Sequence, residues 1–297
     1  MNRSPHHTEP HRELTSPRGA YGLTLTSHEE FPATGGGLIT APAKWPQWHV
    51  RWQVADPDAP AVDDLLDDSH AVAVLAGGGV ARIDRASATT ELTLPHPPTP
   101  QSLVHPHLAI TALVAGGWLG RRTFHAGSFV HGGGVWAVLG DREQGKSSTL
   151  AWLVNAGMPV FADDLLVVEG DTALAGPRVL DLRAGAARHF GMGRDLGVVG
   201  TRERWRVDLE EVPAELPLRG WIVLRWGAHD EPVHVEAVPL AERLEHLVAA
   251  RGVVIAEPST AQWLPIIAKP MVRLRRPRDW NQLDTAMHAL LGALDAA

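Results

Sequence analysis

The sequence predicts an α/β fold preceded by a smaller β-rich domain, and two patterns support this. From about residue 105 onward, segments with strand-like and helix-like apolar spacing follow one another in turn, which is typical of an α/β core. Between residues 21 and 94, short runs of apolar and β-branched residues alternate with polar ones and are broken by turn residues, which is typical of strands. A chain of 297 residues is long enough for one large domain or two small ones.

The N-terminal third divides into a polar tail and a series of strands. Residues 1–18 are polar, with histidines between prolines, and we expect them to form a disordered tail. We expect strands at 21–26, 48–52, 71–75 and 80–83, and the run Gly77–Gly79 predicts antiparallel pairing through a hairpin. The proline-rich stretch 95–100 predicts a linker. The predicted regions are therefore a tail at 1–18, a β-rich domain at 19–100 and an α/β domain at 101–297.

The α/β domain is predicted element by element from its apolar spacing. A helix is expected over 106–119, strands over 124–130 and 135–139, and a helix over 147–155 that Gly157 and Pro159 end. Further strands are expected at 160–168, 221–226 and 233–238, and a helix at 240–251. A last helix is expected from Asp279, which is a suitable N-cap.

The composition excludes several classes of function. A formal net charge of -7 argues against a nucleic-acid-coating surface, and the absence of cysteine excludes disulfides, thiolate zinc sites and cysteine nucleophiles. No apolar run approaches the roughly 20 residues that span a bilayer, so we expect a soluble, cytoplasmic protein without a membrane partner. The sequence leaves open whether the chain forms a homo-oligomer.

A glycine-containing loop between the strand 135–139 and the helix 147–155 carries the clearest chemical signal. Residues 140–147 follow the pattern G-x-x-x-x-G-K-[ST]. In this pattern the main-chain N–H groups surround phosphate oxygens, the lysine reaches the β- and γ-phosphates, and the serine hydroxyl binds Mg²⁺. The following helix adds the partial positive charge of its N-terminus. The predicted nucleotide-binding residues are Gly140, Asp141, Arg142, Glu143, Gln144, Gly145, Lys146, Ser147 and Ser148.

Two adjacent aspartates follow the next apolar run. Asp163 and Asp164 lie between the apolar segments 160–162 and 165–168. Two carboxylates inside an apolar run are unfavourable unless they have a role. Because side chains alternate along a strand, both could reach a bound phosphate only near a strand end or a bend.

The spacing of these motifs resembles that of the HPr kinase/phosphorylase family. Three segments carry the resemblance: Phe124-His125-Ala126, the loop 140–147, and Ala162-Asp163-Asp164. Leu180-Asp181-Leu182-Arg183-Ala184 resembles a further segment of that family, so that the resemblance covers about residues 120–190. It implies a phosphate-loop kinase core of the HPr kinase and PEP carboxykinase-like type. Because the loop interior is charged and the C-terminal segment departs from the family pattern, the chain looks more similar to divergent relatives in peptide-modification clusters, such as lasso-peptide serine kinases.

The resemblance also implies roles for individual residues. Lys146 and the amides of the loop would bind the β- and γ-phosphates of ATP, and Ser147 and Asp164 would hold Mg²⁺. Asp163 would be the general base and His125 would orient the γ-phosphate. Asp181 would hold a second metal ion, and Arg183 would neutralise charge during transfer.

These expectations lead to one principal function and two alternatives. The principal prediction is an ATP- and Mg²⁺-dependent kinase that phosphorylates a serine or threonine hydroxyl of a peptide or small protein, such as a natural-product precursor peptide. The first alternative is a non-catalytic nucleotide-binding protein that presents a precursor peptide to another enzyme. The charged loop residues Asp141–Glu143 and the β-rich N-terminal domain favour it. The second is a kinase for a small-molecule alcohol.

Overall fold

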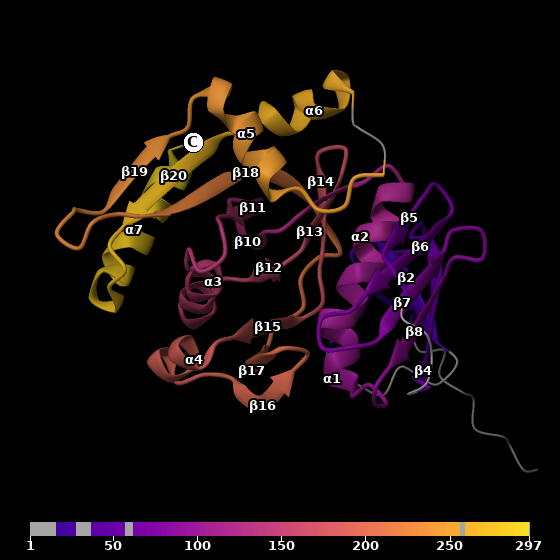
Figure 1. Ribbon diagram of the computed structural model, residues 1–297. Coiled ribbons are helices and arrows are strands. Elements are labelled where there is room, and N and C mark those ends of the chain that lie inside the picture. Colours follow the sequence, from indigo (N-terminus) through magenta and orange to yellow (C-terminus); the bar gives the residue numbers. More distant parts are fainter. Residues whose placement is uncertain (1–15, 28–36, 57–61, 256–258, 297) are drawn as a thin grey trace, which may run out of the picture.

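The computed structural model describes residues 16–27, 37–56, 62–255 and 259–296. These residues form an N-terminal sheet, a central sheet and a small third sheet, with helices between and outside them (Figure 1). The overall class is therefore mixed α/β, as the sequence predicts. Most of the predicted tail, residues 1–15, lies outside the described residues, and the first strand begins at Arg18.

The N-terminal sheet has eight strands in the order β3-β1-β2-β4-β8-β7-β6-β5. Their bounds are β1 Arg18–Ala20, β2 Leu23–Ser27, β3 Ile39–Thr40, β4 Gln47–Val54, β5 Leu65–Leu66, β6 His70–Val74, β7 Val80–Asp84 and β8 Thr89–Leu94. The predicted hairpin at Gly77–Gly79 is confirmed, since β6 and β7 pair antiparallel on either side of it. Strand β4, by contrast, runs parallel to both β2 and β8.

The segment after this sheet packs back onto it. Helix α1 (Pro100–Ser102) and the turn η1 (Leu103–His107) lead into α2 (Leu108–Trp118). Buried residues of α2 share one hydrophobic core with the sheet and with Leu165, Val167 and Leu174. The linker predicted at 95–100 is therefore not a boundary between separate cores, because α2 belongs to the core of the sheet that precedes it.

The central sheet has nine strands, of which seven follow the order β12-β10-β11-β18-β14-β13-β9. Their bounds are β9 Arg122–Phe124, β10 Gly127–His131, β11 Gly134–Leu139, β12 Val160–Ala162, β13 Leu166–Glu169, β14 Thr172–Leu174 and β18 Glu215–Trp226. β20 (Met271–Arg276) pairs with β18, and β19 (His234–Ala237) pairs with β20. Strand β18 is long because its first residues pair with β14 and its later ones with β11 and β20.

Three neighbouring strands of this sheet are parallel. β18 runs parallel to β11 on one side and to β20 on the other. Their carboxyl ends therefore lie at one edge of the sheet, which is where ligands bind in open α/β sheets. The start of β10 and the end of β12 lie at the same edge, because β10 is antiparallel to both β11 and β12.

The remaining elements pack around the central sheet (Figure 1). A three-stranded sheet is formed by β15 (Val179–Leu182), β17 (Arg202–Asp208) and β16 (Arg194–Val199). The helices are α3 Lys146–Asn155, α4 Ala184–Phe190, α5 Leu240–Ala250, α6 Thr260–Ile267 and α7 Leu283–Asp295, the last preceded by the turn η2 Trp280–Gln282. One core joins α3, α7 and the faces of β11, β18 and β20 that α3 and α7 cover. In the part of the chain that the structure describes, no helix is long and apolar enough to cross a membrane.

Two predicted strands are each interrupted, and both interruptions fall on predicted site residues. The strand expected at 124–130 ends at Phe124 and resumes at Gly127, so that His125 lies in the gap. The strand expected at 160–168 breaks at residues 163–165, where Asp164 adopts a left-handed backbone with φ 62°. A non-glycine residue rarely adopts this conformation, and here it turns the chain at the edge where the strands end.

A buried arginine supports the end of β12. Arg178 is 1% exposed and has no carboxylate partner among the described residues. Its guanidinium donates to the main-chain carbonyls of Phe161 (3.0 Å), Glu210 (2.9 Å) and Val160. The contacts fix the last residues of β12, directly before the acidic pair.

Replacing Arg178 with Met should therefore destabilise the fold. The variant removes a donor from several buried carbonyls, and we expect the free energy of unfolding to fall by about 2–4 kcal/mol. Denaturant unfolding measures this change. Arg188→Met, in the exposed part of α4, is the control and should change stability by less than about 0.5 kcal/mol. Equal stability of the two variants would contradict the role given to Arg178.

Candidate functional site

The strand ends at the edge of the central sheet border one large cavity. Its volume is about 600 Å³. Among the predicted residues it is lined by His125, Arg142, Glu143, Gly145, Lys146, Ser147, Ser148, Asp164 and Arg183. It is also lined by Arg202, Glu203, Trp226, Arg276, Arg278, Asp279 and Trp280, together with residues 184–186. The structure therefore brings the glycine loop and Asp164 of the acidic pair to one cavity, although they come from different elements.

The loop between β11 and α3 has the backbone that its sequence predicts. Both glycines have positive φ, 156° at Gly140 and 90° at Gly145. Gly145 precedes the first turn of α3, and no side chain caps this end of the helix. The first amides of a helix have no acceptor within the helix, so those of Lys146 and Ser147 are available to an anion.

Lys146 folds back over the loop. Its Nζ donates to the carbonyl oxygens of Gly140 at 2.6 Å and Asp141 at 3.3 Å. Burial lowers the pKa of Lys146, and the carboxylates of Asp164 and Asp141 oppose that shift. A bound phosphate would offer this ammonium charged acceptors in place of neutral carbonyls.

The charged loop interior is explained by contacts with the end of β18. Asp141 forms an ion pair with Arg225 at 2.9 Å. The Oε1 atom of Gln144 accepts from the main-chain N–H of Trp226 at 3.2 Å, and the indole Nε1 of Trp226 donates to the carbonyl of Glu143 at 3.0 Å. Asp141 and Gln144 therefore attach the loop to β18, whereas Arg142 and Glu143 are exposed on the cavity wall.

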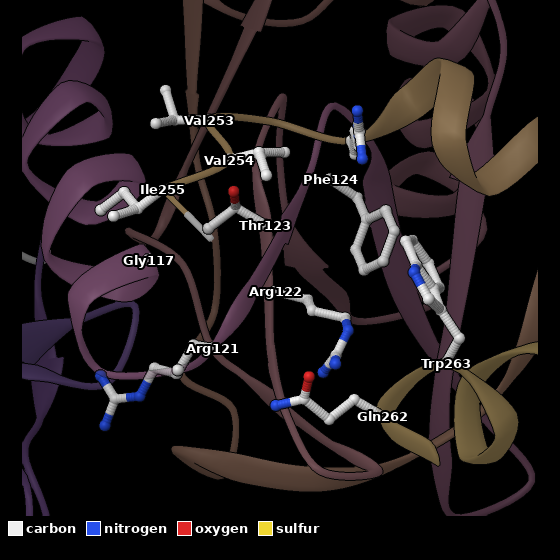
Figure 2. Close-up of a pocket in the computed structure, with 12 residues that line it drawn as sticks. Gly117, Arg121, Arg122, Thr123, Phe124, Val253, Val254, Ile255, Gln262 and Trp263 are labelled. Atoms are coloured by element: carbon white, nitrogen blue, oxygen red, sulfur yellow. The ribbon is translucent and has the colours of Figure 1, made fainter. Parts of the chain in front are cut away.

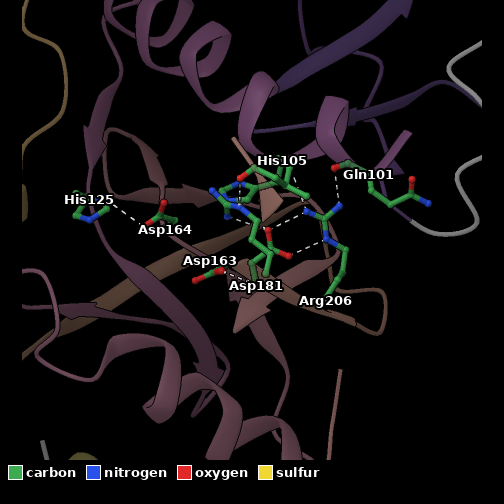
Figure 3. Close-up of polar contacts among 9 residues, drawn as sticks. Gln101, His105, His125, Asp163, Asp164, Asp181 and Arg206 are labelled. Carbon is green, nitrogen blue, oxygen red and sulfur yellow. Dashed lines mark hydrogen bonds and ion pairs between the residues drawn. The ribbon is translucent and has the colours of Figure 1, made fainter. Parts of the chain in front are cut away.

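His125 and Asp164 meet at the cavity wall (Figure 3). The Nδ1 atom of His125 lies 3.4 Å from Oδ1 of Asp164, and their side chains are 55% and 46% exposed. The main-chain N–H of His125 donates to the carbonyl of Ala250 at 2.6 Å, which holds the gap between β9 and β10 in place. The pair is thus accessible to a ligand from solvent.

Asp163 lies behind Asp164 and does not line the cavity. Its Oδ2 accepts from the main-chain N–H of Asp181 at 3.1 Å. Burial and the neighbouring charge of Asp164 raise the pKa of Asp163 to about 8, and the hydrogen bond from Asp181 opposes that shift only in part. Of the two aspartates, the structure therefore places Asp164 at the cavity, with Asp163 protonated behind it at neutral pH.

Asp181 belongs to a buried ion cluster instead of the cavity wall (Figure 3). Its side chain is 3% exposed, and it accepts from Arg206 at 2.8 Å through both oxygens and from Arg204 at 2.9 Å. Burial pushes the pKa of Asp181 upward, but the bonds and charge of Arg206, followed by His105 and Arg204, hold it below its ordinary value. The geometry corrects the expectation that Asp181 holds a metal ion, because two guanidinium groups already occupy its oxygens.

The same cluster ties the three-stranded sheet to the segment after the N-terminal sheet. Arg206 also donates to the carbonyls of Gln101 at 2.5 Å and His105 at 3.1 Å. Arg204 and Arg206 thus have a structural role, while Arg202, at the start of β17, lines the cavity. The three arginines are each two residues apart on β17, so their spacing alone does not show which of them lines the cavity and which has a structural role.

A smaller cavity of about 130 Å³ lies between α2, β9 and α6 (Figure 2). None of the predicted site residues lines it. Arg122 lies over the ring of Trp263 at 5.6 Å, and the other walls come from Gly117, Thr123 and residues 253–255. It shares no lining residue with the larger cavity that the loop lines.

The larger cavity is also lined by several residues that were not predicted as site residues. They are Arg202, Glu203, Trp226, Arg276, Arg278, Asp279 and Trp280. Most come from the ends of β18 and β20 or from the segment that follows β20. Because their position depends on the parallel pairing of distant strands, no local pattern predicted it.

Asparagine at position 163 should weaken the pH dependence of stability. The folded state keeps the Asp163 proton up to about pH 8, whereas the carboxyl of the unfolded chain titrates near 3.8. The stability that the protonated group contributes is therefore complete below about pH 4 and is lost as the pH rises through about 8. Melting temperatures between pH 5 and 9 should fall more steeply for the wild type than for Asp163→Asn.

Asp230→Asn provides the control for this measurement, since Asp230 is exposed. Its curve should follow that of the wild type. Parallel curves for the wild type and Asp163→Asn would show that Asp163 is not protonated in the fold.

Comparison with known proteins gives a distant structural similarity and no match by sequence to a protein family or a curated protein. No protein-family model and no curated protein matches the chain. The structure is similar to that of the HPr(Ser) kinase/phosphatase from Coxiella burnetii with a TM-score of 0.29 and 15% sequence identity. The match covers 59% of this chain and 97% of the other.

Proposed function

We propose that the protein is an ATP- and Mg²⁺-dependent kinase that transfers the γ-phosphate to a serine or threonine hydroxyl of a peptide or small protein. One observation supports this most directly: Lys146 and Ser147 of the loop line the same cavity as His125 and Asp164. A phosphate-binding loop beside a carboxylate and an imidazole can position a nucleotide phosphate and stabilise its charge during transfer.

The charge of the cavity supports an anionic ligand. Its lining contains six basic side chains, namely Lys146 and five arginines, against four acidic ones. The whole chain has a formal net charge of -7, so that this local excess of positive charge is opposite to the charge of the whole chain. A concave site with positive charge attracts phosphate groups and raises their local concentration.

The residues present fit a magnesium ion that a nucleotide brings with it. Within the residues that the structure describes, no three acidic or histidine side chains form a cluster that could hold a metal by themselves. Mg²⁺ at nucleotide sites is commonly held by substrate phosphates and one or two protein oxygens. Ser147 and Asp164 supply such oxygens at the cavity wall, and the bound ion would neutralise charge on the phosphates.

The proposed step requires a positioned phosphate and a proton acceptor. The acceptor oxygen forms a bond to the γ-phosphorus as the bond from that phosphorus to the bridging oxygen breaks, and ADP leaves. Lys146 binds the phosphate oxygens, and His125 orients the γ-phosphate. Asp163, which lies directly behind Asp164 at the cavity wall, is the proposed acceptor of the hydroxyl proton. A cation at Asp164 would weaken the repulsion that, together with burial, raises the pKa of Asp163.

Substitution of Lys146 tests nucleotide binding. Lys146→Met removes a charge-assisted contact to the phosphates, and we expect the Kd for MgATP to rise by about 10- to 100-fold. Isothermal titration calorimetry gives the value. Lys269→Met is the matched control, because Lys269 forms an exposed ion pair with Asp171 at 3.5 Å and should leave the Kd unchanged. Equal affinity of the two variants would exclude the loop as the nucleotide site.

Substitution of the two aspartates separates binding from transfer. With γ-labelled ATP and candidate peptides, Asp163→Asn should slow transfer by about 100-fold or more with little change in Kd. Asp164→Asn should mainly weaken the dependence of binding on Mg²⁺. Normal transfer by Asp163→Asn would show that Asp163 is not the base. Nucleotide binding without transfer to any acceptor would favour a recognition protein that presents a peptide to another enzyme.

A further inference from the structure

One arginine at the cavity is buried with two of its nitrogen atoms unpaired. Arg276 is the last residue of β20 and is 4% exposed. Its Nε and Nη2 atoms are buried and have no hydrogen-bond partner among the described residues. Burial lowers the pKa of Arg276 to about 10. An unpaired buried guanidinium is unfavourable in a folded protein, so the structure maintains it against a considerable desolvation penalty.

The position of Arg276 follows from the alternation of side chains along β20. Val272 and Leu274 belong to the core between the central sheet and the helices α3 and α7. Arg276 comes two residues after Leu274, on the same face of β20. The other two arginines of β20 are on the opposite face and are paired. Arg273 contacts Glu236 at 2.7 Å, and Arg275 contacts Glu231 at 2.7 Å. Arg276 is thus the arginine of this strand that points into the fold.

Arg276 lies directly beside the glycine loop. A Cβ atom placed on Gly145 would be 2.8 Å from its Nη2 and 3.0 Å from the ring of Trp226. The guanidinium carbon lies 4.5 Å from the centre of that ring, in a cation–π contact. Trp226 therefore holds the guanidinium against Gly145, whose lack of a side chain leaves room for this close approach.

We propose that Arg276 is a phosphate-binding residue of the nucleotide site. It binds, beside Lys146, the phosphates that the amides of Gly145 and of the start of α3 surround. This inference rests on the proposed function. The unpaired Nε and Nη2 atoms give the guanidinium two parallel donors, the geometry that binds two oxygens of one phosphate. The β-phosphate is the group expected there, because the loop amides surround the α- and β-phosphates. Trp226 packs against the guanidinium and donates from its indole to the carbonyl of Glu143, so that it links Arg276 to the loop.

The test compares MgATP and MgADP binding to the full-length wild type, Arg276→Met and Arg275→Met by calorimetry. Arg276→Met should raise the Kd for both nucleotides by a similar factor of about 10 to 100, since both carry the β-phosphate. Arg275→Met is the matched control one residue away on the paired face, and its Kd should remain within about threefold of the wild type. The salt dependence of the Kd should also become weaker in Arg276→Met, because one cation no longer contacts the ligand.

Stability without nucleotide provides a second measurement. Removal of an unpaired buried charge should leave the melting temperature of Arg276→Met equal to or above that of the wild type. Should this variant fail to fold, Arg276→Gln, which is neutral and polar, replaces it with the same expected loss of affinity. A folded variant that binds MgATP as the wild type does would overturn the inference and leave the proposed function intact. Absence of MgATP binding to the wild type would instead overturn the proposed function.

Discussion

The parallel pairing of β18 with β11 and β20 is the constraint on which the site depends. It places the carboxyl ends of three strands at one edge, although β11, β18 and β20 are far apart in sequence. The glycine loop follows β11, Trp226 ends β18 and Arg276 ends β20. Without that pairing the loop would be a surface turn with a charged interior. With it, Asp141 and Gln144 have partners on β18, and the cavity has a positively charged wall.

Burial divides the charged residues around this edge into two groups. Asp181, Arg204 and Arg206 satisfy one another in a buried cluster that joins the three-stranded sheet to the segment 101–105. Arg276 is also buried and Lys146 is partly buried. The ammonium of Lys146 donates only to carbonyls, and Arg276 lacks a hydrogen-bond partner for two of its donors. In the paired cluster the opposite charges offset much of one another's desolvation, whereas these two cations need an anion to do so. The difference between the groups is the physical basis for assigning the second group to a ligand.

The sequence predicted the parts of the site that are local. The loop 140–147 and its flanking strand and helix depend on residues close together in the chain, and the structure has each of them near its predicted place. The single strand predicted at 160–168 is instead broken at residues 163–165. The sequence did not predict which carboxylate of the aspartate pair faces the cavity, because this depends on the left-handed turn at Asp164. The resemblance implied that Asp181 holds a metal ion. No local pattern shows that Arg204 and Arg206 pair with it across β15 and β17. Arg276 and Trp226 depend on long-range parallel pairing, which apolar periodicity does not specify.

The central claim is that the loop between β11 and α3 holds the phosphates of a nucleotide. The most direct measurement is a crystal structure of the protein with MgADP. We expect the β-phosphate to lie within hydrogen-bonding distance of Lys146 and of the first amides of α3, with Nζ of Lys146 displaced from the carbonyl of Gly140. A nucleotide bound elsewhere, with Lys146 still on that carbonyl at the present 2.6 Å, would contradict it.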